Sequence, residues 1–371
     1  MAALRFLLAG GGTSGHINPA LAIAEQIRRD HPAAEILFLG TARGIESEIV
    51  PRAGFDFKAI RARGLPTRPS LEMARALADY LAGRRQCRQL LKNFRPNAVI
   101  GTGGYVCSPV VAAAASLHIP VLLHEQNAFP GRSNRLMARR SQAVCISFAG
   151  TERYFPVGIK TTLTGNPVRD IFFHMDSRQA RAALAIDPLQ RVILVMGGSL
   201  GARSLNQAVL GLDGQLPANP VAGAEKPPMV ILAAGKKQYE AVKEAAAGKN
   251  WLTVRDYIHD MHLYMAAADL IICRAGAMTC AELSALGRPS ILVPYPYAAG
   301  DHQTFNARAL ADAGAAVLCP DSEMTPVWLA AALARLFNDP ACLDRMGKSA
   351  LALARPDAAA AICRQLYEVM Q

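Results

Sequence analysis

The strongest constraint on the fold is a pattern that occurs twice, half the chain apart. An apolar run at 4–9 leads into the glycine-rich segment 10–15, and a second run at 192–196 leads into the glycine-rich segment 197–201. Each run resembles a buried strand, and a helical pattern follows each glycine segment. Glycines there let backbone N–H groups approach an anion, and the next helix start carries about half a positive charge. The pattern predicts two nucleotide-type domains and a phosphate-bearing substrate.

Short apolar runs alternate with helical patterns along the whole chain, which is typical of parallel sheets with crossover helices. The 371 residues exceed one typical core. We therefore expect an α/β protein with two Rossmann-like, doubly wound parallel-sheet domains that face a cleft. The strands are expected at 4–9, 35–39, 57–60, 98–101, 121–124, 143–146 and 161–164, and then at 191–196, 229–234, 252–255, 270–273, 290–293 and 316–318.

The expected domains are 1–164 and 165–345, with the junction at a turn-rich segment after the strand at 161–164. A helical segment, 346–371, is expected to pack back on the first domain after a break at Arg355-Pro356. Residues 211–228 are rich in Gly, Pro, Ala and Asn and predict a surface loop. Prolines interrupt the uncharged segment 106–123, so no transmembrane helix is expected.

The net charge of +11 lies entirely in the first half. Residues 1–165 hold 21 Lys and Arg against 10 Asp and Glu, whereas the remainder holds 19 of each sign. Such a field attracts membrane lipid, nucleic acid or a phosphorylated substrate. Nucleic-acid binding would need aromatic residues among the basic ones, and only 6% of the residues are aromatic, so no nucleic-acid partner is expected. The eight cysteines include no Cys-x-x-Cys and predict reduced thiols.

The first glycine segment fits two nucleotide motifs only in part. Segment 10–15 has the spacing Gly-x-Gly-x-x-Gly, but a dinucleotide site also needs an acid at the end of the second strand, and the strand at 35–39 is followed by Gly-Thr. As a P-loop the segment lacks the Lys and Ser/Thr, because His16-Ile17 stands there. Neither an NAD enzyme nor a Walker NTPase is favoured, and no cofactor is expected. A tight turn without a ligand is the alternative.

His16 directly follows the glycines at the start of a helical pattern. This position is at the carboxyl edge of the sheet, where open α/β folds bind ligands. The positive end of the helix favours a neutral imidazole, which can accept a proton. A capping or exposed histidine is the alternative interpretation.

Other polar groups follow later strands. The strand at 121–123 is followed by the polar row 124–127, which we expect to line a cleft, with an ordinary polar loop as the alternative. Glu282 lies one turn inside the helix after the strand at 270–273, where it could bind ribose hydroxyls or simply favour the helix start. Gln303 could bind sugar hydroxyls or cap the next helix.

Seven segments together carry a family resemblance that spans nearly the whole chain. They are GGGTSGHINPALAIAE (10–25), GTGGYVCSPV (101–110), HEQNAFPGRSNR (124–135), GNPVR (165–169), GGSLGARSLN (197–206), CRAGAMTCAEL (273–283) and DHQTFNARAL (301–310). In these segments the chain resembles glycosyltransferase family 28, the bacterial peptidoglycan N-acetylglucosaminyltransferases of GT-B fold. The resemblance implies transfer of N-acetylglucosamine from UDP-GlcNAc to the muramic acid 4-hydroxyl of lipid I, undecaprenyl-pyrophosphoryl-MurNAc-pentapeptide, with inversion to give lipid II. A UDP-sugar epimerase of the same fold is the alternative.

The resemblance also implies roles for individual residues. His16 matches the position usually proposed as general base. The acceptor side would include Gly103, Gly104, Tyr105 and Glu125. Ser14 and Cys280 replace residues that are commonly glycine and valine. No Asp-x-Asp occurs, so a metal-independent reaction is expected. The donor UDP-GlcNAc would meet Thr13, Ser14, Gly15, Asn127, Arg169, Ser199, Ile258, Ala277, Met278, Thr279, Cys280, Ala281, Glu282 and Gln303.

Segment 71–94 has a helical pattern in which leucines alternate with basic residues. We expect part of it to lie on an anionic membrane surface beside the lipid-linked acceptor. The resemblance implies a peripheral protein at the cytoplasmic face of the bacterial inner membrane. The alternative is an amphipathic helix that packs on its own core and has a solvated basic side.

Overall fold

The computed structural model describes residues 3–64, 70–198, 200–217 and 228–371. The chain divides into two compact units: unit 1 comprises Met1–Val168 with Arg355–Gln371, and unit 2 comprises Arg169–Ala354. Each unit contains one parallel sheet, which confirms the predicted class of two doubly wound domains. The boundary expected after residue 345 falls inside a continuous helix, α14 (Pro340–Ala352), and the chain returns to unit 1 at Arg355.

The sheet of unit 1 has the strand order β3-β2-β1-β4-β5-β6-β7, and all of its pairs are parallel. Successive residues of a strand point to opposite faces, so the buried apolar run of β1 serves two cores. The strands are β1 (Arg5–Gly10), β2 (Glu35–Gly40), β3 (Asp56–Ala59), β4 (Ala98–Gly103), β5 (Val121–Glu125), β6 (Ala143–Ile146) and β7 (Thr161–Leu163).

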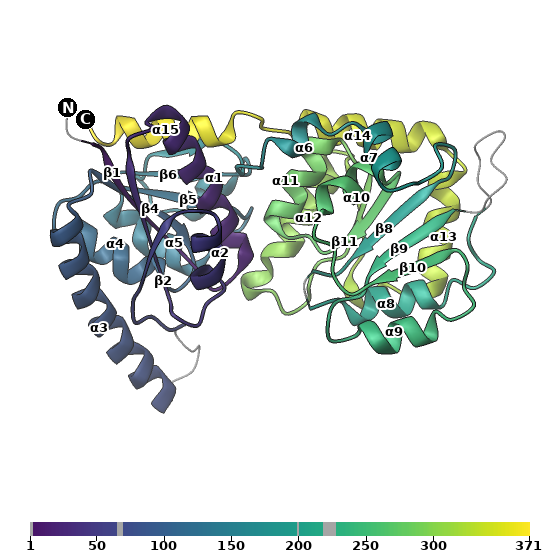
Figure 1. The fold of residues 1–371 in the computed structure, drawn as a ribbon, viewed down its shortest axis with the longest axis horizontal. Helices are drawn as coiled ribbons and strands as arrows, with labels where there is room; N and C mark the ends of the chain where they lie inside the picture. The colour runs from purple at the N-terminus through teal and green to yellow at the C-terminus, as the bar shows by residue number, and fades with distance from the viewer. Residues whose placement is uncertain (1–2, 65–69, 199, 218–227) are drawn as a thin grey trace. The chain divides into compact units, whose positions relative to one another are not determined.

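Helices cover both faces of this sheet. On one face, Phe6 and Leu8 pack with α1, α2 and α15; on the other, Leu7 and Ala9 pack with α3, α4 and α5. The last helix of the chain, yellow in Figure 1, lies beside the purple first helix. The helices are α1 (Ser14–Asp30), α2 (Glu46–Arg52), α3 (Leu71–Phe94), α4 (Cys107–Ala115), α5 (Arg132–Met137) and α15 (Ala358–Glu368), with 3₁₀ turns at Ala138–Arg140 and Thr151–Tyr154.

Unit 2 repeats this plan with the order β10-β9-β8-β11-β12-β13, again parallel throughout. Its strands are β8 (Val192–Met196), β9 (Met229–Ala233), β10 (Leu252–Arg255), β11 (Leu270–Cys273), β12 (Ser290–Leu292) and β13 (Ala316–Leu318). Its helices are α6 (Ile171–His174), α7 (Ser177–Ala183), α8 (Arg203–Leu210), α9 (Tyr239–Ala245), α10 (Met261–Ala267), α11 (Ala277–Leu286), α12 (His302–Asp312), α13 (Pro326–Phe337) and α14, with 3₁₀ turns at Ala299–Asp301 and Asp321–Glu323.

The strand orders place one topological switch point in each unit. In unit 1 the order reverses between β1 and β4, and in unit 2 between β8 and β11. Open α/β sheets bind ligands at the carboxyl ends of the strands at such points. Both glycine segments that follow β1 and β8 therefore lie where a ligand is expected.

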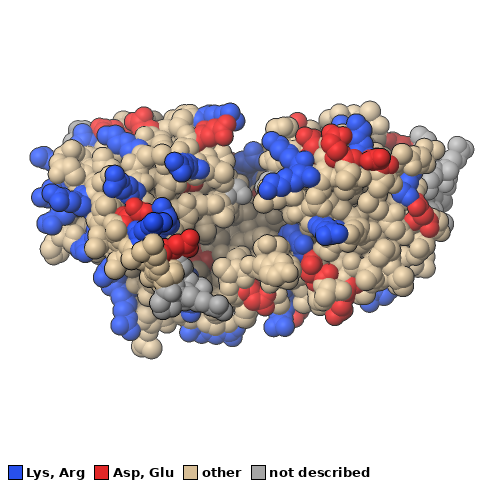
Figure 2. Space-filling model, turned by 90° about the horizontal axis from the view of Figure 1, so that it is seen from below, with Lys and Arg blue, Asp and Glu red and all other residues tan. Residues whose placement is uncertain are grey.

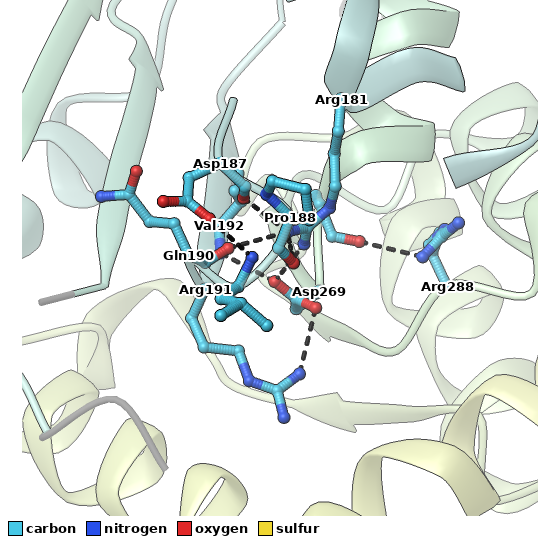
Figure 3. Close-up of polar contacts among 10 residues, drawn as sticks. Arg181, Asp187, Pro188, Gln190, Arg191, Val192, Asp269 and Arg288 are labelled. Atoms are coloured by element: carbon cyan, nitrogen blue, oxygen red, sulfur yellow. Dashed lines mark hydrogen bonds and ion pairs between the residues drawn. The ribbon is translucent and has the colours of Figure 1, made fainter. Parts of the chain in front are cut away.

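An ion-pair cluster braces unit 2 at the opposite, amino-terminal edge of its sheet (Figure 3). Asp269, just before β11, accepts hydrogen bonds from Arg181 Nη2 at 2.7 Å and Arg191 Nη1 at 3.0 Å. Its Oδ2 also accepts from the backbone N–H of Val192 at 2.8 Å. Arg288 Nη1 donates to the carbonyl of Ala268. The cluster thus ties α7 to the first residues of the two central strands.

Candidate functional site

The glycine segment after β1 is packed too tightly for side chains. A Cβ added to Gly11 would lie 2.7 Å from Glu46 Oε1. Gly12 has a φ of +88°, and a Cβ there would lie 2.9 Å from the ring of Tyr105. The loop therefore needs glycine both for its backbone conformation and for its close approach to α2 and to the loop after β4.

His16 lies in the first turn of α1, next to this loop. Its Nδ1 is 3.2 Å from the carbonyl oxygen of Gly11 and 3.1 Å from Thr13 Oγ1. A carbonyl only accepts, so a bond to Gly11 assigns the proton to Nδ1 and the lone pair of a neutral ring to Nε2. In this tautomer Nε2 is the nitrogen that accepts a proton.

The loop after β4 forms a wall against the His16 ring. A Cβ on Gly103 would lie 3.0 Å from His16 Cδ2, and one on Gly104 would collide with the Gly11 carbonyl. Both glycines have positive φ, +101° and +78°. Thr102 Oγ1 donates to the carbonyl of His16 at 2.8 Å. The structure thus brings together five residues named from the sequence: Thr13, His16, Gly103, Gly104 and Tyr105.

Glu46, which the sequence analysis missed, holds this loop from inside the protein. It is 1% exposed. Its Oε1 accepts from the backbone N–H and the hydroxyl of Thr41, both at 2.9 Å, and its Oε2 accepts from the N–H of Gly12 at 3.3 Å. The sequence feature that could have revealed Glu46 is an acid at the start of the helix after β2. It lies six residues beyond Gly40, the strand end at which a dinucleotide fold carries its acid.

The polar row 124–127 at the end of β5 is mostly buried, so the expectation that it lines a cleft is wrong for His124, Glu125 and Gln126; Asn127 alone of the four is partly exposed. His124 Nε2 lies 3.1 Å from the Gly165 carbonyl, and Gln126 Nε2 lies 2.9 Å from His124 Nδ1. Burial lowers the pKa of His124 to about 4. His124 is therefore a neutral interior histidine whose partners come from the protein.

Glu125 organises the loop that carries Asn127. Its carboxylate accepts from the backbone N–H groups of Asn127 and Gly131 at 2.9 and 3.0 Å. It also accepts from the side-chain amides of Asn127 and Asn134 at 3.1 and 2.9 Å. Burial raises the pKa of Glu125, and these donors oppose that rise. The carboxylate is therefore enclosed by its own loop, and a contact between Glu125 and the acceptor stays a prediction.

In unit 2, α11 begins at the carboxyl end of β11, next to the switch point. Ala277 and Cys280 are buried, whereas the side chains of Met278, Thr279 and Ala281 are partly exposed. Burial raises the pKa of the Cys280 thiol to about 12, so it is an inert packing group.

Glu282 and Arg169 interact electrostatically in unit 2. Burial raises the pKa of Glu282 to about 7, and Arg169 opposes this shift. The Arg169 guanidinium also lies 5.4 Å from the ring centre of Phe172. The structure therefore places the residues expected at the donor diphosphate and ribose within reach of each other's charge.

The remaining residues expected to bind the donor are distributed over both units. Ile258 follows β10 and is buried, as its expected backbone role allows. Gln303 Oε1 accepts from the N–H of Tyr295 at 2.9 Å, so this oxygen holds the loop after β12. Gly15 lies in the first turn of α1. Ser199, the Ser14 side chain and most of the expected surface loop 211–228 lie outside the described part of the chain.

Arg274 joins several loops at this edge and was missed by the sequence analysis. Its Nη1 donates to Asp321 Oδ1 at 2.6 Å and to the carbonyls of Val293 and Pro294. Its Nη2 donates to Ser204 Oγ at 3.3 Å. The partners follow β8, β12 and β13 in sequence, so no local pattern could have revealed the cluster.

Within the described ranges, no group of three or more His, Cys, Asp or Glu side chains could hold a metal ion. No helix among the same residues is long and apolar enough to cross a membrane.

Two parallel-sheet units, each with a glycine loop at its switch point, define the class of two-domain Rossmann-like folds called GT-B. The glycosyltransferase family 28 N-terminal domain matches residues 6–146, and the glycosyltransferase family 28 C-terminal domain matches residues 192–362. The chain belongs to glycosyltransferase family 28.

Named relatives match nearly the whole chain. It is 46% identical over 365 residues to the UDP-N-acetylglucosamine--N-acetylmuramyl-(pentapeptide) pyrophosphoryl-undecaprenol N-acetylglucosamine transferase of Desulforudis audaxviator, covering 96% of this chain and 95% of the relative. It is similar to the crystal structure of Acinetobacter baumannii MurG, with a TM-score of 0.76, 32% identity and coverage of 99% and 100%. A Neisseria meningitidis UDP-GlcNAc 2-epimerase, 15% identical with a TM-score of 0.69 and coverage of 98% and 100%, shares the fold alone.

Proposed function

We propose that this protein transfers N-acetylglucosamine from UDP-GlcNAc to the 4-hydroxyl of the MurNAc unit of lipid I, and so forms lipid II. The observation that carries the proposal is full-length similarity to enzymes named for this transfer, combined with a histidine fixed at the switch point of unit 1. The epimerase alternative is supported by fold alone.

In the proposed mechanism His16 acts as general base in unit 1. Its Nε2 takes the proton of the 4-hydroxyl as the oxygen attacks the anomeric carbon. The new bond joins this oxygen to C1, and the bond from C1 to the β-phosphate oxygen breaks, so the electron pair leaves with UDP. A single displacement inverts the anomeric configuration. Base catalysis of this kind contributes about 10² to 10⁴-fold.

Unit 2 is proposed to bind the donor. The start of α11 would stabilise the negative charge that develops on the departing diphosphate, together with Arg169 and Ser199. Glu282 would accept hydrogen bonds from the ribose hydroxyls, the backbone at Ile258 would meet the uracil, and Gln303 would contact the sugar. No metal ion is part of this proposal.

The test is transfer of labelled N-acetylglucosamine to a lipid I analogue. We expect transfer that requires the acceptor, persists in excess EDTA, and falls at least about 100-fold in kcat in His16→Ala. His174→Ala, which removes an exposed histidine of unit 2, is the matched control. UDP-GlcNAc turnover without acceptor would favour the epimerase; loss in EDTA with rescue by magnesium would refute metal independence. A loss below tenfold in His16→Ala would exclude an essential base.

We further propose that unit 1 lies on the anionic cytoplasmic face of the inner membrane through α3. The buried stripe of α3 is Ala76, Gly83, Cys87 and Leu91, whereas three of its five leucines, those at 71, 77 and 81, are 53–70% exposed. Arg84, Arg85 and Arg88 are exposed on the same helix. In Figure 2, blue side chains prevail over red on unit 1, at the left. Exposed leucines beside arginines suit an anionic interface.

Co-sedimentation with liposomes tests this surface. We expect binding that rises with the anionic lipid fraction and falls several-fold in the double variant Leu77→Ser, Leu81→Ser. The control changes two similarly exposed leucines of unit 2, Leu189 and Leu351, to Ser. Equal binding of both double variants, or no dependence on anionic lipid, would refute the proposed docking.

A further inference from the structure

One peptide group links the buried carboxylate of unit 1 to its histidine. The peptide between Gly11 and Gly12 donates its N–H to Glu46 Oε2 at 3.3 Å, and its carbonyl lies 3.2 Å from His16 Nδ1. We propose that Glu46 is a positioning residue that acts on His16 through this peptide and favours the tautomer with the proton on Nδ1. The inference rests on the proposed role of His16 as the base.

The peptide is held in place from several sides. Glu46 is fixed by the two hydrogen bonds that Thr41 donates to its Oε1. A Cβ on Gly11 would lie 2.9 Å from a methyl group of Val106, and Gly104 packs against the Gly11 carbonyl. The peptide therefore has little freedom to turn its N–H or its carbonyl toward other partners.

Hydrogen-bond chemistry determines which tautomer of His16 the contact with Glu46 favours. A carboxylate that accepts from a peptide N–H polarises the amide, and its carbonyl oxygen becomes a stronger acceptor. His16 Nδ1 lies within hydrogen-bond distance of the Gly11 carbonyl, which only accepts, and of the Thr13 hydroxyl, which can also donate, so these groups compete for it. A donating Thr13 hydroxyl would require the opposite tautomer, with the proton on Nε2. Glu46 favours the first arrangement and so leaves the lone pair on Nε2.

A purely structural role for Glu46 makes a different prediction. Glu46 also holds Thr41 at the end of β2, so its removal could act only by loosening that turn. The control is Thr41→Val, which removes one hydrogen bond to the same carboxylate and leaves the bond from Gly12. Glu46→Gln keeps an oxygen for Thr41 but places an amide N–H₂ against the Gly12 N–H. Because an amide nitrogen cannot accept, the hydrogen bond from Gly12 is lost.

The primary measurement is the tautomer of His16 in the full-length protein without substrates. ¹⁵N spectra of histidine-labelled protein, assigned with His16→Gln, distinguish a proton on Nδ1 from one on Nε2. We expect Nδ1–H to predominate in the wild type, to decline in Glu46→Gln, and to be unchanged in Thr41→Val. Removal of the competing hydroxyl in the double variant Glu46→Gln, Thr13→Val should restore Nδ1–H.

Kinetics provide the second measurement. Glu46→Gln should lower kcat about tenfold, part of what a base contributes, with the KM for UDP-GlcNAc within about twofold of the wild type. Thr41→Val should stay within about twofold in both. If Glu46→Gln does not fold, Glu46→Asp, which withdraws the carboxylate by one methylene, replaces it.

Each outcome decides between the two roles. An unchanged tautomer in Glu46→Gln, or equal effects of Glu46→Gln and Thr41→Val, would overturn the inference. The spectra need no activity, so they also separate it from the proposed function: a tautomer change without a kcat change, together with an active His16→Ala, would refute the base and leave the linkage standing.

Discussion

Replacing Glu282 with glutamine removes a charge that the folded protein accommodates poorly. Glu282 lies on α11, near the carboxyl end of β11, and its side chain is only partly exposed. Burial raises its pKa from an ordinary 4.5 to about 7, although Arg169 opposes the shift. The ionised carboxylate is therefore less stable in the folded state than in the unfolded chain.

The pKa shift sets the size and the sign of the effect. A rise from 4.5 to about 7 corresponds at most to about 3 kcal/mol, at roughly 1.4 kcal/mol for each tenfold change in the dissociation constant. Partial exposure to solvent reduces this to about 2 kcal/mol. Between pH 4.5 and 7 the folded state binds more protons than the unfolded state, so the stability of the wild type falls as the pH rises through this interval. Glutamine has no proton to lose and avoids this cost.

The assay is thermal unfolding of the ligand-free wild type and Glu282→Gln at pH 5 and pH 8. At pH 8 the variant should unfold about 4–8 °C higher, given about 2–4 °C per kcal/mol for a domain of this size. At pH 5 only about a quarter of the difference should remain. Glu240→Gln, at an exposed carboxylate of α9, controls for the loss of a negative charge. A Tm difference that is the same at both pH values would refute the reasoning.

Two further substitutions test packing. Asp269→Asn leaves Arg181 without its carboxylate partner and should lower the free energy of unfolding in urea by about 2–4 kcal/mol, because a buried charge is left unpaired. A loss below about 0.5 kcal/mol would contradict the stabilising role of the ion-pair cluster in Figure 3. Gly104→Ala should abolish most transfer, since its Cβ collides with the Gly11 carbonyl. Gly158→Ala, also at positive φ but in open space, should cost only about 1–2 kcal/mol and keep full activity; equal losses of activity would refute the collision argument.

The strands could be predicted because each is a buried apolar run bounded by turn residues. The expected ranges 143–146, 252–255, 270–273 and 316–318 coincide with β6, β10, β11 and β13. Parallel strands that are covered on both faces cannot carry charge in their interior, so hydropathy alone locates them. The glycine loops could be predicted for a similar local reason, because positive φ and close packing both exclude side chains.

The hydrogen bonds and burial of the polar side chains could not be predicted, because they depend on partners distant in sequence. Glu125 and Asn127 are neighbours at a strand end, yet one is enclosed by four donors and the other is partly exposed. His124 is neutral because burial lowers its pKa to about 4, although the hydrogen bond to the carbonyl of Gly165, 41 residues later, opposes this shift. Nothing in residues 121–127 alone determines which side chains face inward.

Glu46 shows how the same edge of a nucleotide-type sheet can serve a different chemistry. In dinucleotide folds an acid at the end of the second strand binds the ribose. Here β2 ends in Gly40, and the nearby acid, Glu46, accepts a hydrogen bond from the N–H of Gly12. An N–H that donates to a carboxylate cannot also cradle a phosphate, and the carboxylate repels an anion placed beside it. The N–H of Gly12 is therefore committed to Glu46 rather than to a bound phosphate.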